Sequence, residues 1–364
     1  MEKIILVCGG NSVEHEISIL TTKQVYRAIN KEKYDIKVVY ISKGNKFYLV
    51  DDIENVKEIN CLKKKPITLI KEDNIQYFKY KRAKYYFDYL FLLVHGKGVE
   101  DGTLAAYLEF NNIPYISNNI LSSAIGMNKS LSKDYVKTIN VKTLDHILLD
   151  VNNYNYDELV TNLNDYPYIF KANSLGSSIG VIKVNNEYEI IDAINAISVY
   201  DEFIIIEKCL EDFKEYNVAL FTLNEEYIIS SIEEINYKKI LTYDDKYSNN
   251  GLDNLERIIS PKINKKLIDL IINNSKKIYS KLGCDLLVRI DYIFDNINNT
   301  LYFNEINMIP GSLAYYLYED KEIMFDELID LLIDKGKRNI YLKKKTVNLL
   351  GDNLLEKLVN NIKK

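Results

Sequence analysis

The sequence lacks several features that particular protein classes require. It has no Trp and only four Cys among 364 residues. Cys8, Cys61, Cys209 and Cys284 stand far apart, and none belongs to a Cys-x-x-Cys pair. Neither a zinc knuckle nor a dithiol redox site is therefore indicated. We interpret the four residues as buried thiols of a protein from a reducing compartment.

Long apolar runs and an excess of basic residues are also missing. The run from Leu90 to Val94 is far shorter than the roughly 18 residues of a membrane span. The first residues lack the extended apolar region of a signal peptide. A net charge of −5 argues against a general binder of nucleic acid or membrane surfaces. We predict a cytoplasmic protein that binds neither nucleic acid nor membranes.

What the sequence does contain is typical of a folded chain. Its 47% hydrophobic content excludes intrinsic disorder. At about 150 residues per domain, the length predicts two or three domains. The 30 Tyr are interpreted mainly as compositional drift, because the chain is also rich in Lys, Asn and Ile.

The N-terminal third alternates strand and helix patterns. Two buried apolar runs end in glycine loops: Ile4 to Cys8 precedes Gly9-Gly10, and Tyr89 to Val94 precedes His95-Gly-Lys-Gly98. The intervening and following patterns predict helices at 17–29 and 103–110 and strands at 37–41 and 113–116. This alternation predicts an open parallel α/β sheet, which binds ligands at the carboxyl ends of its strands.

The rest of the chain predicts two further units. Strands at 168–171 and 180–184 flank a Gly/Ser loop, which indicates a hairpin flap, preceded by a helix over 121–138. A strand at 203–207 closes this unit. The third unit is predicted to have strands at 216–223, 226–235, 286–294 and 300–306 and a helix at 262–282. We divide the chain into units 1–118, 119–206 and 207–340 and a Lys-rich tail 341–364 with a helical pattern at 347–362.

The stretch from Leu286 to Asn307 is the most informative. Residues two apart on a strand share a face, so Arg289 points with Asp291, and Glu305 points with Asn307. If the two strands pair through the turn between them, one sheet face carries all four side chains. Two carboxylates and an amide oxygen suit Mg²⁺. A solvated hairpin face with an Arg–Asp ion pair is the competing interpretation.

Other polar residues each allow two interpretations. The loop from Gly176 to Gly180 offers backbone N–H groups to a phosphate, with Lys171 upstream, but taken alone it is more typical of a flexible turn. The strand end at Glu207 exposes backbone that could read an adenine edge, or it is ordinary surface. Glu14 is a ligand or a helix cap. His95 faces a substrate or makes a structural hydrogen bond.

Taken in order, these segments resemble the D-alanine–D-alanine ligases of the ATP-grasp superfamily. The matching stretches are 9–18, 95–103, 126–129, 171–180, 243–247, 289–291 and 304–311, and the resemblance extends to about residue 339. It implies an ATP-grasp fold behind the N-terminal α/β sheet. It also implies ligation of two D-alanines through a D-alanyl phosphate, for peptidoglycan, by an enzyme that is commonly a homodimer.

The resemblance also implies roles for individual residues in binding Mg-ATP. Phosphates would be held by Lys129, Lys171 and Ser178. The adenine would lie against Glu207, Lys208, Cys209 and Leu210, and the ribose against Glu215, with Asn304 also assigned to the nucleotide site. Asp291, Glu305 and Asn307 would hold two Mg²⁺ ions, with Mn²⁺ as a substitute.

For the amino acids, the resemblance implies a triad of Glu14, Ser177 and Tyr247 around the first D-alanine. Arg289 and the Gly311 N–H would stabilise the oxyanion. His95, Ser312 and Lys246 are further substrate residues. Lys246 and Tyr247 would lie on a loop that closes the site.

The sequence departs from the family pattern at the acceptor end. Tyr316 stands where the ligases usually have Ser, and the segment 211–214 lacks the usual Gly. A tyrosine hydroxyl can donate the same bond, but its ring needs more space. A ligase that joins D-alanine to another amine or hydroxy acid is therefore the nearer alternative. A catalytically silent nucleotide-binding regulator is the third hypothesis.

Overall fold

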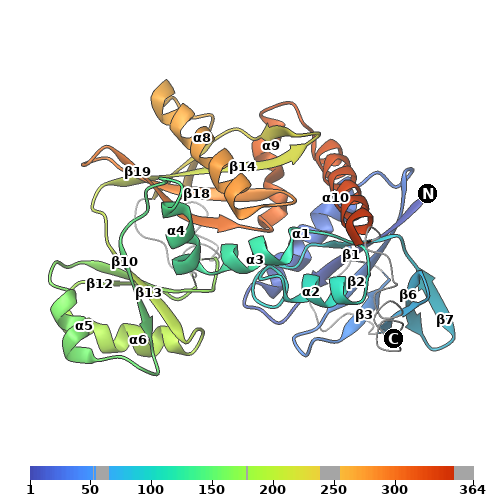
Figure 1. Cartoon of the computed structure of the whole chain (residues 1–364), viewed down its shortest axis with the longest axis horizontal. Coiled ribbons are helices and arrows are strands. Elements are labelled where there is room, and N and C mark those ends of the chain that lie inside the picture. Colours follow the sequence, from blue (N-terminus) through green and yellow to red (C-terminus); the bar gives the residue numbers. More distant parts are fainter. Residues whose placement is uncertain (52, 55–64, 178, 238–254, 348–364) are drawn as a thin grey trace, which may run out of the picture.

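The computed structural model describes residues 1–51, 53–54, 65–177, 179–237 and 255–347. Within them the chain forms three sheet-based units and one small additional sheet (Figure 1). No helix of these residues combines the length and apolarity needed to cross a bilayer.

The N-terminal unit contains the predicted α/β sheet. Its strand order is β4-β3-β2-β1-β8-β9. These are β1 (Glu2–Gly9), β2 (Tyr34–Ile41), β3 (Phe47–Val50), β4 (Lys65–Pro66), β8 (Tyr89–Leu92) and β9 (Tyr115–Ile116), with helices α1 (His15–Ala28) and α2 (Thr103–Phe110). The pairs β1–β2, β1–β8 and β8–β9 are parallel, whereas β3 and β4 add an antiparallel edge that we did not predict.

A separate three-stranded sheet was also not predicted. It contains β5 (Thr68–Glu72), β6 (Ile75–Tyr80) and β7 (Ala83–Tyr86), all antiparallel. Its strands mix Lys and Tyr, and most of their side chains are only partly buried. A short strand without a fully buried face lacks the regular apolar alternation on which prediction from sequence depends.

The central unit is an antiparallel sheet in the order β10-β13-β11-β12. It comprises β10 (His146–Asp150), β11 (Tyr168–Ala172), β12 (Val181–Val184) and β13 (Phe203–Lys208), with α5 (Tyr156–Asn162), η2 (Glu187–Glu189) and α6 (Ile190–Ser198). Strands β11 and β12 pair directly, which confirms the predicted hairpin around the Gly/Ser loop. Ile190, Ala193, Ile194 and Ile197 of α6 are buried in the core of this unit.

The third unit is a larger antiparallel sheet in the order β17-β16-β14-β18-β19, with β15 also paired to β14. Its strands are β14 (Phe213–Leu223), β15 (Glu226–Ile229), β16 (Glu233–Tyr237), β17 (Leu255–Ile259), β18 (Val288–Asp295) and β19 (Thr300–Asn307). The helices are α3 (Ile120–Met127), α4 (Lys129–Lys137), α8 (Lys265–Leu282), η4 (Gly311–Ala314), α9 (Tyr315–Glu319) and α10 (Phe325–Val347).

Two predicted elements are each divided in the structure. The helix over 121–138 is interrupted at Asn128, whose side chain accepts from the N–H of Leu131 and so caps a new helix, α4. The strand over 226–235 is interrupted at Ser230, whose hydroxyl accepts from the N–H of Ala219 in place of a backbone carbonyl. In both cases one polar side chain replaces a backbone partner.

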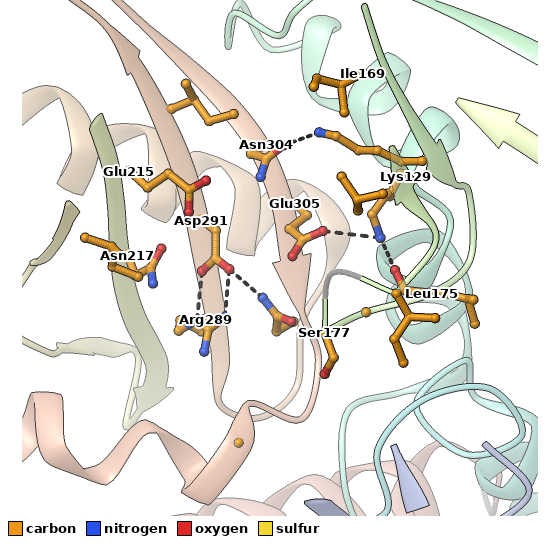
Figure 2. A pocket seen from close by; sticks show the side chains of 18 of the residues that line it. Lys129, Ile169, Leu175, Ser177, Glu215, Asn217, Arg289, Asp291, Asn304 and Glu305 are labelled. Atoms are coloured by element: carbon orange, nitrogen blue, oxygen red, sulfur yellow. Dashed lines mark hydrogen bonds and ion pairs between the residues drawn. The ribbon is translucent and has the colours of Figure 1, made fainter. Parts of the chain in front are cut away.

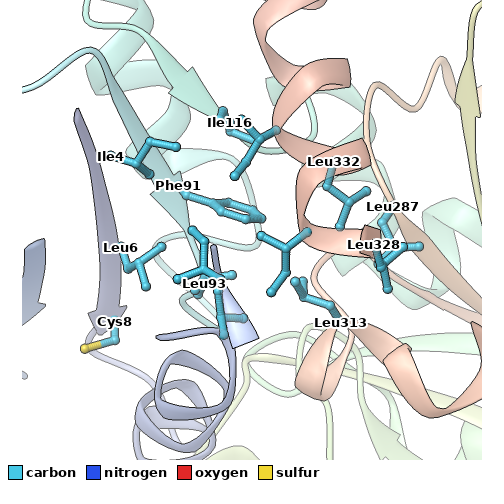
Figure 3. Packing of buried hydrophobic residues seen from close by; sticks show 14 of the residues in the cluster. Ile4, Leu6, Cys8, Phe91, Leu93, Ile116, Leu287, Leu313, Leu328 and Leu332 are labelled. Carbon is cyan, nitrogen blue, oxygen red and sulfur yellow. The ribbon is translucent and has the colours of Figure 1, made fainter. Parts of the chain in front are cut away.

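The core between the first and third units fixes their relative position. Ile4, Leu6 and Phe91 on one face of the N-terminal sheet pack against Leu328 and Leu332 of α10 (Figure 3). The alternate residues of β1 and β8 face the other core, which includes Ala105 and Leu108 of α2. This two-sided burial explains why the strands read as continuous apolar runs.

Helix α10 crosses the boundary that we drew from the sequence at residue 340. It continues across residue 340 to Val347, so the first part of the Lys-rich tail belongs to this helix. The remainder of the tail, with the helix predicted there, lies outside the described residues. Cys8, Cys209 and Cys284 are buried free thiols, as predicted, and Cys61 lies outside the described residues.

Candidate active site

One pocket gathers most of the polar residues that the sequence singled out. It lies where the β11–β12 hairpin faces the sheet that contains β14, β18 and β19 (Figure 2). Among the predicted site residues, those that line it are Glu14, His95, Lys129, Lys171, Ser177, Glu207, Lys208, Cys209, Leu210, Glu215, Arg289, Asp291, Asn304, Glu305, Asn307, Gly311 and Tyr316. Ser178, Lys246 and Tyr247 lie outside the described residues.

A row of polar residues crosses the floor of this pocket. The register places Glu233 of β16 opposite Asn217 of β14, Asn217 opposite Asp291 of β18, and Asp291 opposite Glu305 of β19. Directly paired residues project from the same face of a sheet, so four strands contribute to one surface. This confirms that β18 and β19 pair as the sequence predicted and extends the row to Glu233.

A β-bulge brings Asn304 into the same pocket. The register of β18 and β19 shifts between Asp291 and Tyr292, which leaves Asn304 without a partner in the ladder. Its Oδ1 accepts from Lys171 Nζ at 3.3 Å. Because a bulge redirects a side chain, neighbouring residues Asn304 and Glu305 both line the site.

Arg289 and Asp291 form a two-pronged ion pair on β18. Arg289 Nε and Nη2 donate to the two oxygens of Asp291 at 2.7 Å each. Asn307 Nδ2 donates to Asp291 Oδ2 at 3.0 Å. Burial alone would lower the pKa of Arg289, but the Asp291 carboxylate holds that pKa well above its usual range. The guanidinium therefore stays charged beside the pocket.

The donor set on β18 and β19 suits a hard cation. Burial raises the pKa of Asp291, the paired Arg289 guanidinium offsets part of this rise, and the nearby Glu305 and Glu233 carboxylates add to it. A bound cation would relieve this concentration of negative charge, and Asp291, Glu305 and Asn307 offer it oxygen atoms. The described residues contain no group of three His, Cys, Asp or Glu side chains placed to hold one ion.

Two lysines approach the pocket from the side opposite the carboxylates. Lys129 Nζ lies 3.2 Å from Glu305 Oε2 and also donates to the carbonyl of Leu175 in the hairpin loop. Lys171 Nζ lies 2.8 Å from Glu207 Oε2. Both ammonium groups therefore lie close to β19, Lys129 beside Glu305, as Figure 2 shows, and Lys171 beside Asn304.

Glu207 is buried between two lysines. Its second oxygen lies 2.7 Å from Lys133 Nζ, and both of these side chains are 1% exposed. Burial would raise the pKa of Glu207, but Lys133 and Lys171 lower it to about 2. The Glu207 carboxylate is thus engaged by the two lysines. Any contact with an adenine base at this strand end would therefore come from the backbone of residues 207–210.

Glu14 occupies the N-cap position of α1 but makes no side-chain cap hydrogen bond. Its Oε1 instead accepts from the Ser177 hydroxyl in the hairpin loop. A Cβ at Gly176 would lie 3.0 Å from Glu14 Oε1, so the glycine allows this close approach. Glu14 therefore stands at the helix N-terminus, as the cap interpretation expects, but its side chain makes its hydrogen bond to the flap. Its carboxylate links the first unit to the flap.

His95 is buried at the edge of the pocket. Burial lowers its pKa to about 4, which keeps the imidazole neutral near pH 7. Its Nε2 shares a hydrogen bond of 3.0 Å with the Thr21 hydroxyl, which also accepts from the N–H of Ser312. The Ser312 hydroxyl donates to Gln24 of α1 rather than lining the pocket. Ser312 therefore joins η4 to α1.

The structure adds residues that sequence reasoning missed. Lys133 follows Lys129 by one helical turn on α4, and this i,i+4 spacing was the available signal. Glu100 is a buried carboxylate that accepts from the N–H groups of Gly96 and Ile309, within a stretch already noted for its glycines. Glu233 and Arg257 left no such signal, because only the pairing of distant strands brings them into the pocket.

This architecture defines a class of enzyme. The Gly/Ser loop forms a flap on the central antiparallel sheet. This flap faces a second antiparallel sheet that bears paired carboxylates, and lysines lie between the two sheets. These features are those of an ATP-grasp enzyme.

Comparison with known proteins identifies the family. Residues 3–118 match the D-ala D-ala ligase N-terminus, and residues 136–334 match the D-ala D-ala ligase C-terminus. A D-alanine–D-alanine ligase of Thermosipho melanesiensis is 32% identical over 363 residues, which are 98% of this chain and 99% of the relative. The chain therefore belongs to the D-alanine–D-alanine ligase family.

Two solved structures agree with this assignment. The D-alanine–D-alanine ligase of Coxiella burnetii has a TM-score of 0.84 at 26% identity, over 95% of this chain and 97% of the other. The VanG D-Ala:D-Ser ligase of Enterococcus faecalis has a TM-score of 0.78 at 25% identity, over 92% and 99%. The mixed α/β fold with several sheets is thus the fold of these ligases.

Proposed function

We propose that this enzyme joins two D-alanines to D-alanyl-D-alanine for peptidoglycan synthesis, with ATP converted to ADP and phosphate. The observation that supports this most is the face shared by Arg289, Asp291, Glu305 and Asn307, opposed by Lys129 and Lys171 in one pocket. Cations on one side and oxygen donors on the other suit a metal-bound nucleoside triphosphate.

The nucleotide is assigned to the end of the pocket nearest the flap. Lys129, Lys171 and Ser178 would hold the phosphates, the backbone from Glu207 to Leu210 the adenine, and Glu215 the ribose. Two Mg²⁺ ions held by Asp291, Glu305 and Asn307 would neutralise phosphate charge when bound. Asn304 would orient Lys171, whose ammonium it already contacts.

The first D-alanine is assigned to the Glu14–Ser177 contact. Its ammonium would pair with Glu14, while Tyr247 completes the triad and Lys246 closes the site with it. The carboxylate oxygen of this D-alanine attacks the γ-phosphorus, ADP leaves, and an acylphosphate forms. Exclusion of water then matters, because water would hydrolyse that intermediate before an amine arrives.

Amide formation follows at the same carbonyl carbon. The amine of the second D-alanine attacks it, a C–N bond forms, and phosphate leaves with the electrons of the broken C–O bond, while the nitrogen loses its extra protons. Arg289 and the N–H of Gly311 would stabilise the oxyanion of the tetrahedral intermediate. His95 and Ser312 support this end of the site through Thr21.

Tyr316 keeps a second candidate open, namely ligation of D-alanine to another amine or hydroxy acid. The relative from Enterococcus faecalis, a D-Ala:D-Ser ligase, supports considering it. We also propose that the enzyme is a homodimer, which sedimentation velocity would test.

Product analysis separates the two candidates. Phosphate release is measured with ATP and D-alanine alone, and the product is identified by mass spectrometry. D-alanyl-D-alanine at full rate supports the first candidate. Turnover that begins only when D-serine or D-lactate is added supports the second.

A further inference from the structure

Three residues outside the assigned catalytic set form a cluster at the acceptor end of the pocket. Glu233 is fully buried, Arg257 is half-exposed, and Tyr316 contacts both. They come from β16, β17 and α9, which lie far apart in the sequence. All three line the pocket, and neither Glu233 nor Arg257 has been given a role.

Glu233 holds Tyr316 in place. Its Oε2 accepts from the Tyr316 hydroxyl and from Asn217 Nδ2, each at 3.2 Å. The neighbouring Tyr315 stacks on Phe325 of α10, with ring centroids 4.3 Å apart, which anchors the start of α9. A buried carboxylate on one side and a stacked ring on the other therefore leave Tyr316 little rotational freedom.

Arg257 lies over the same tyrosine without a tight ion pair. Its guanidinium carbon is 5.8 Å from the centre of the Tyr316 ring. Its Nη1 is 3.6 Å from Glu233 Oε1, which is longer than a direct hydrogen bond. Glu233 Oε1 has no hydrogen-bond partner among the described residues. The guanidinium therefore retains donors that a ligand can use.

The charges at this end complement an amino acid zwitterion. Arg257 supplies a cation at the outer rim, where 47% of its side chain is exposed, whereas Glu233 and Asp291 supply anions deeper on the floor. If an amino acid binds with its carboxylate at the rim, its amine points toward the floor. Arg289 and Gly311 also line the pocket there. Guanidinium groups bind carboxylates well because their N–H groups match both oxygens.

We propose that Arg257 binds the carboxylate of the acceptor amino acid, and that Glu233 positions Arg257 and holds the Tyr316 ring beside it. This inference deepens the proposed function and depends on it. Arg257 would be a specificity-determining residue and Glu233 a positioning residue. The Tyr316 ring fills space that a smaller residue would leave open, so the site selects an acceptor with a free carboxylate and a small side chain.

The test is a competition between two acceptors for one acylphosphate. D-Alaninamide has an amine but no carboxylate, so ATP cannot activate it and it can act only as an acceptor. With ATP, D-alanine and D-alaninamide present together, the products are D-alanyl-D-alanine and its amide, which mass spectrometry separates. Their ratio reports acceptor choice alone, since nucleotide binding, first-site binding and the active fraction affect both products equally.

Arg257→Met should lower the ratio of dipeptide to dipeptide amide by about 10- to 100-fold, the usual effect of losing a charged hydrogen bond. Arg257→Lys should lower it less. Tyr316→Phe should change it little, because the Tyr316 hydroxyl donates to Glu233 and not to the acceptor. Glu233→Gln should lower it slightly, since an amide oxygen can still accept from Tyr316.

Lys214→Met is the matched control. Lys214 pairs with Glu234 Oε1 at 2.7 Å, on neighbouring residues of β14 and β16 whose side chains point away from the pocket. This variant also removes a cation from a strand ion pair, and its product ratio should equal that of the wild type.

A ratio unchanged in Arg257→Met overturns the proposal, whatever happens to the overall rate. Failure of the proposed function looks different, because the wild type would then make no D-alanyl-D-alanine. If it accepts D-serine instead, the same ratio is measured with D-serine against D-serinamide. An unchanged ratio there also overturns the proposal, and a lowered ratio supports it.

Discussion

The Ser177 hydroxyl donates to the carboxylate of Glu14, although the two residues are 163 positions apart in the chain. Ser177 lies in the flap of the central unit, at a backbone φ of 56°, and Glu14 lies at the start of α1 in the first unit. Burial raises the pKa of Glu14, while the Ser177 hydroxyl and the nearby Lys129 lower it. The position of the flap therefore affects the charge of Glu14 in the first-substrate site.

Glu14→Gln should weaken binding of the first D-alanine far more than binding of ATP. The amide can still accept from Ser177, but it no longer attracts an ammonium group, so we expect a loss of about 10- to 100-fold at the first site. Calorimetric titrations with D-alanine and with a nonhydrolysable ATP analogue measure the two affinities. Equal losses in both titrations would contradict the assignment of Glu14.

Lys133→Met should raise the KM for ATP about tenfold with little change in the KM for D-alanine. Lys133 and Lys171 share the Glu207 carboxylate, so removing one cation pulls the carboxylate and Lys171 away from the phosphate site. Steady-state kinetics with each substrate varied in turn measures this difference. Lys137→Met is the control, because the Lys137 side chain is exposed at the C-terminal end of the same helix.

A purely structural role for Lys133 predicts another pattern. Breaking a buried ion pair destabilises a protein by about 3–5 kcal/mol, so the single variant should also lose stability. Lys171 still pairs with Glu207 in this variant, so the carboxylate keeps one cation. If stability falls while the KM for ATP stays normal, Lys133 only stabilises the fold.

The sequence was most informative where a site depends on local alternation. Arg289 and Asp291 stand two apart, and so do Glu305 and Asn307, so one short turn was enough to place all four on a common face. Their pairing in the structure follows from this periodicity. The bulge that admits Asn304 could not be predicted, because one added residue in a ladder leaves no periodic signal.

Contacts between distant strands and units were beyond sequence reasoning. Glu233 joins the row of Asn217 and Asp291 only because β14 pairs with both β16 and β18, and this register depends on the packing of the whole sheet. Glu14 is different, since its contact with Ser177 was expected from the family resemblance, although the local pattern alone favoured a helix cap. Lys246 and Tyr247, outside the described residues, stay predictions.

His95 and Glu100 should give folding stability opposite pH dependences. Burial lowers the pKa of His95 from 6.5 to about 4 and raises the pKa of Glu100 from 4.5 to about 7. As pH falls from 6.5 to 4, the unfolded chain binds a proton at His95 that the native state does not, so stability is lost. As pH rises from 4.5 to 7, the native state keeps a proton on Glu100 that the unfolded chain releases, so stability is again lost.

Single variants should separate these two effects, which largely cancel in the wild type. Stability of Glu100→Gln should rise by up to about 3 kcal/mol from pH 4 to 6.5, because the His95 contribution is no longer opposed by that of Glu100. Stability of His95→Gln should instead fall by a similar amount from pH 4.5 to 7. Urea unfolding at a series of pH values measures both slopes, and parallel slopes in the two variants would contradict the assignment.

Gly336→Ala should destabilise the fold even though alanine favours helices. Gly336 lies where α10 meets β9, and a Cβ there would lie 2.7 Å from Ile116 Cγ2, in a core where Ile116 is fully buried. The gain in helix propensity is about 1 kcal/mol, whereas overpacking costs about 1–3 kcal/mol. We expect a net loss of about 1 kcal/mol in urea unfolding. Gly44→Ala is the control, since its Cβ would contact only the Ser42 hydroxyl at 3.8 Å. Ile116→Ala makes room for the methyl group, so Gly336→Ala should be stabilising in that background. A loss of the same size in both backgrounds would show that close packing of α10 on β9 is not the cause.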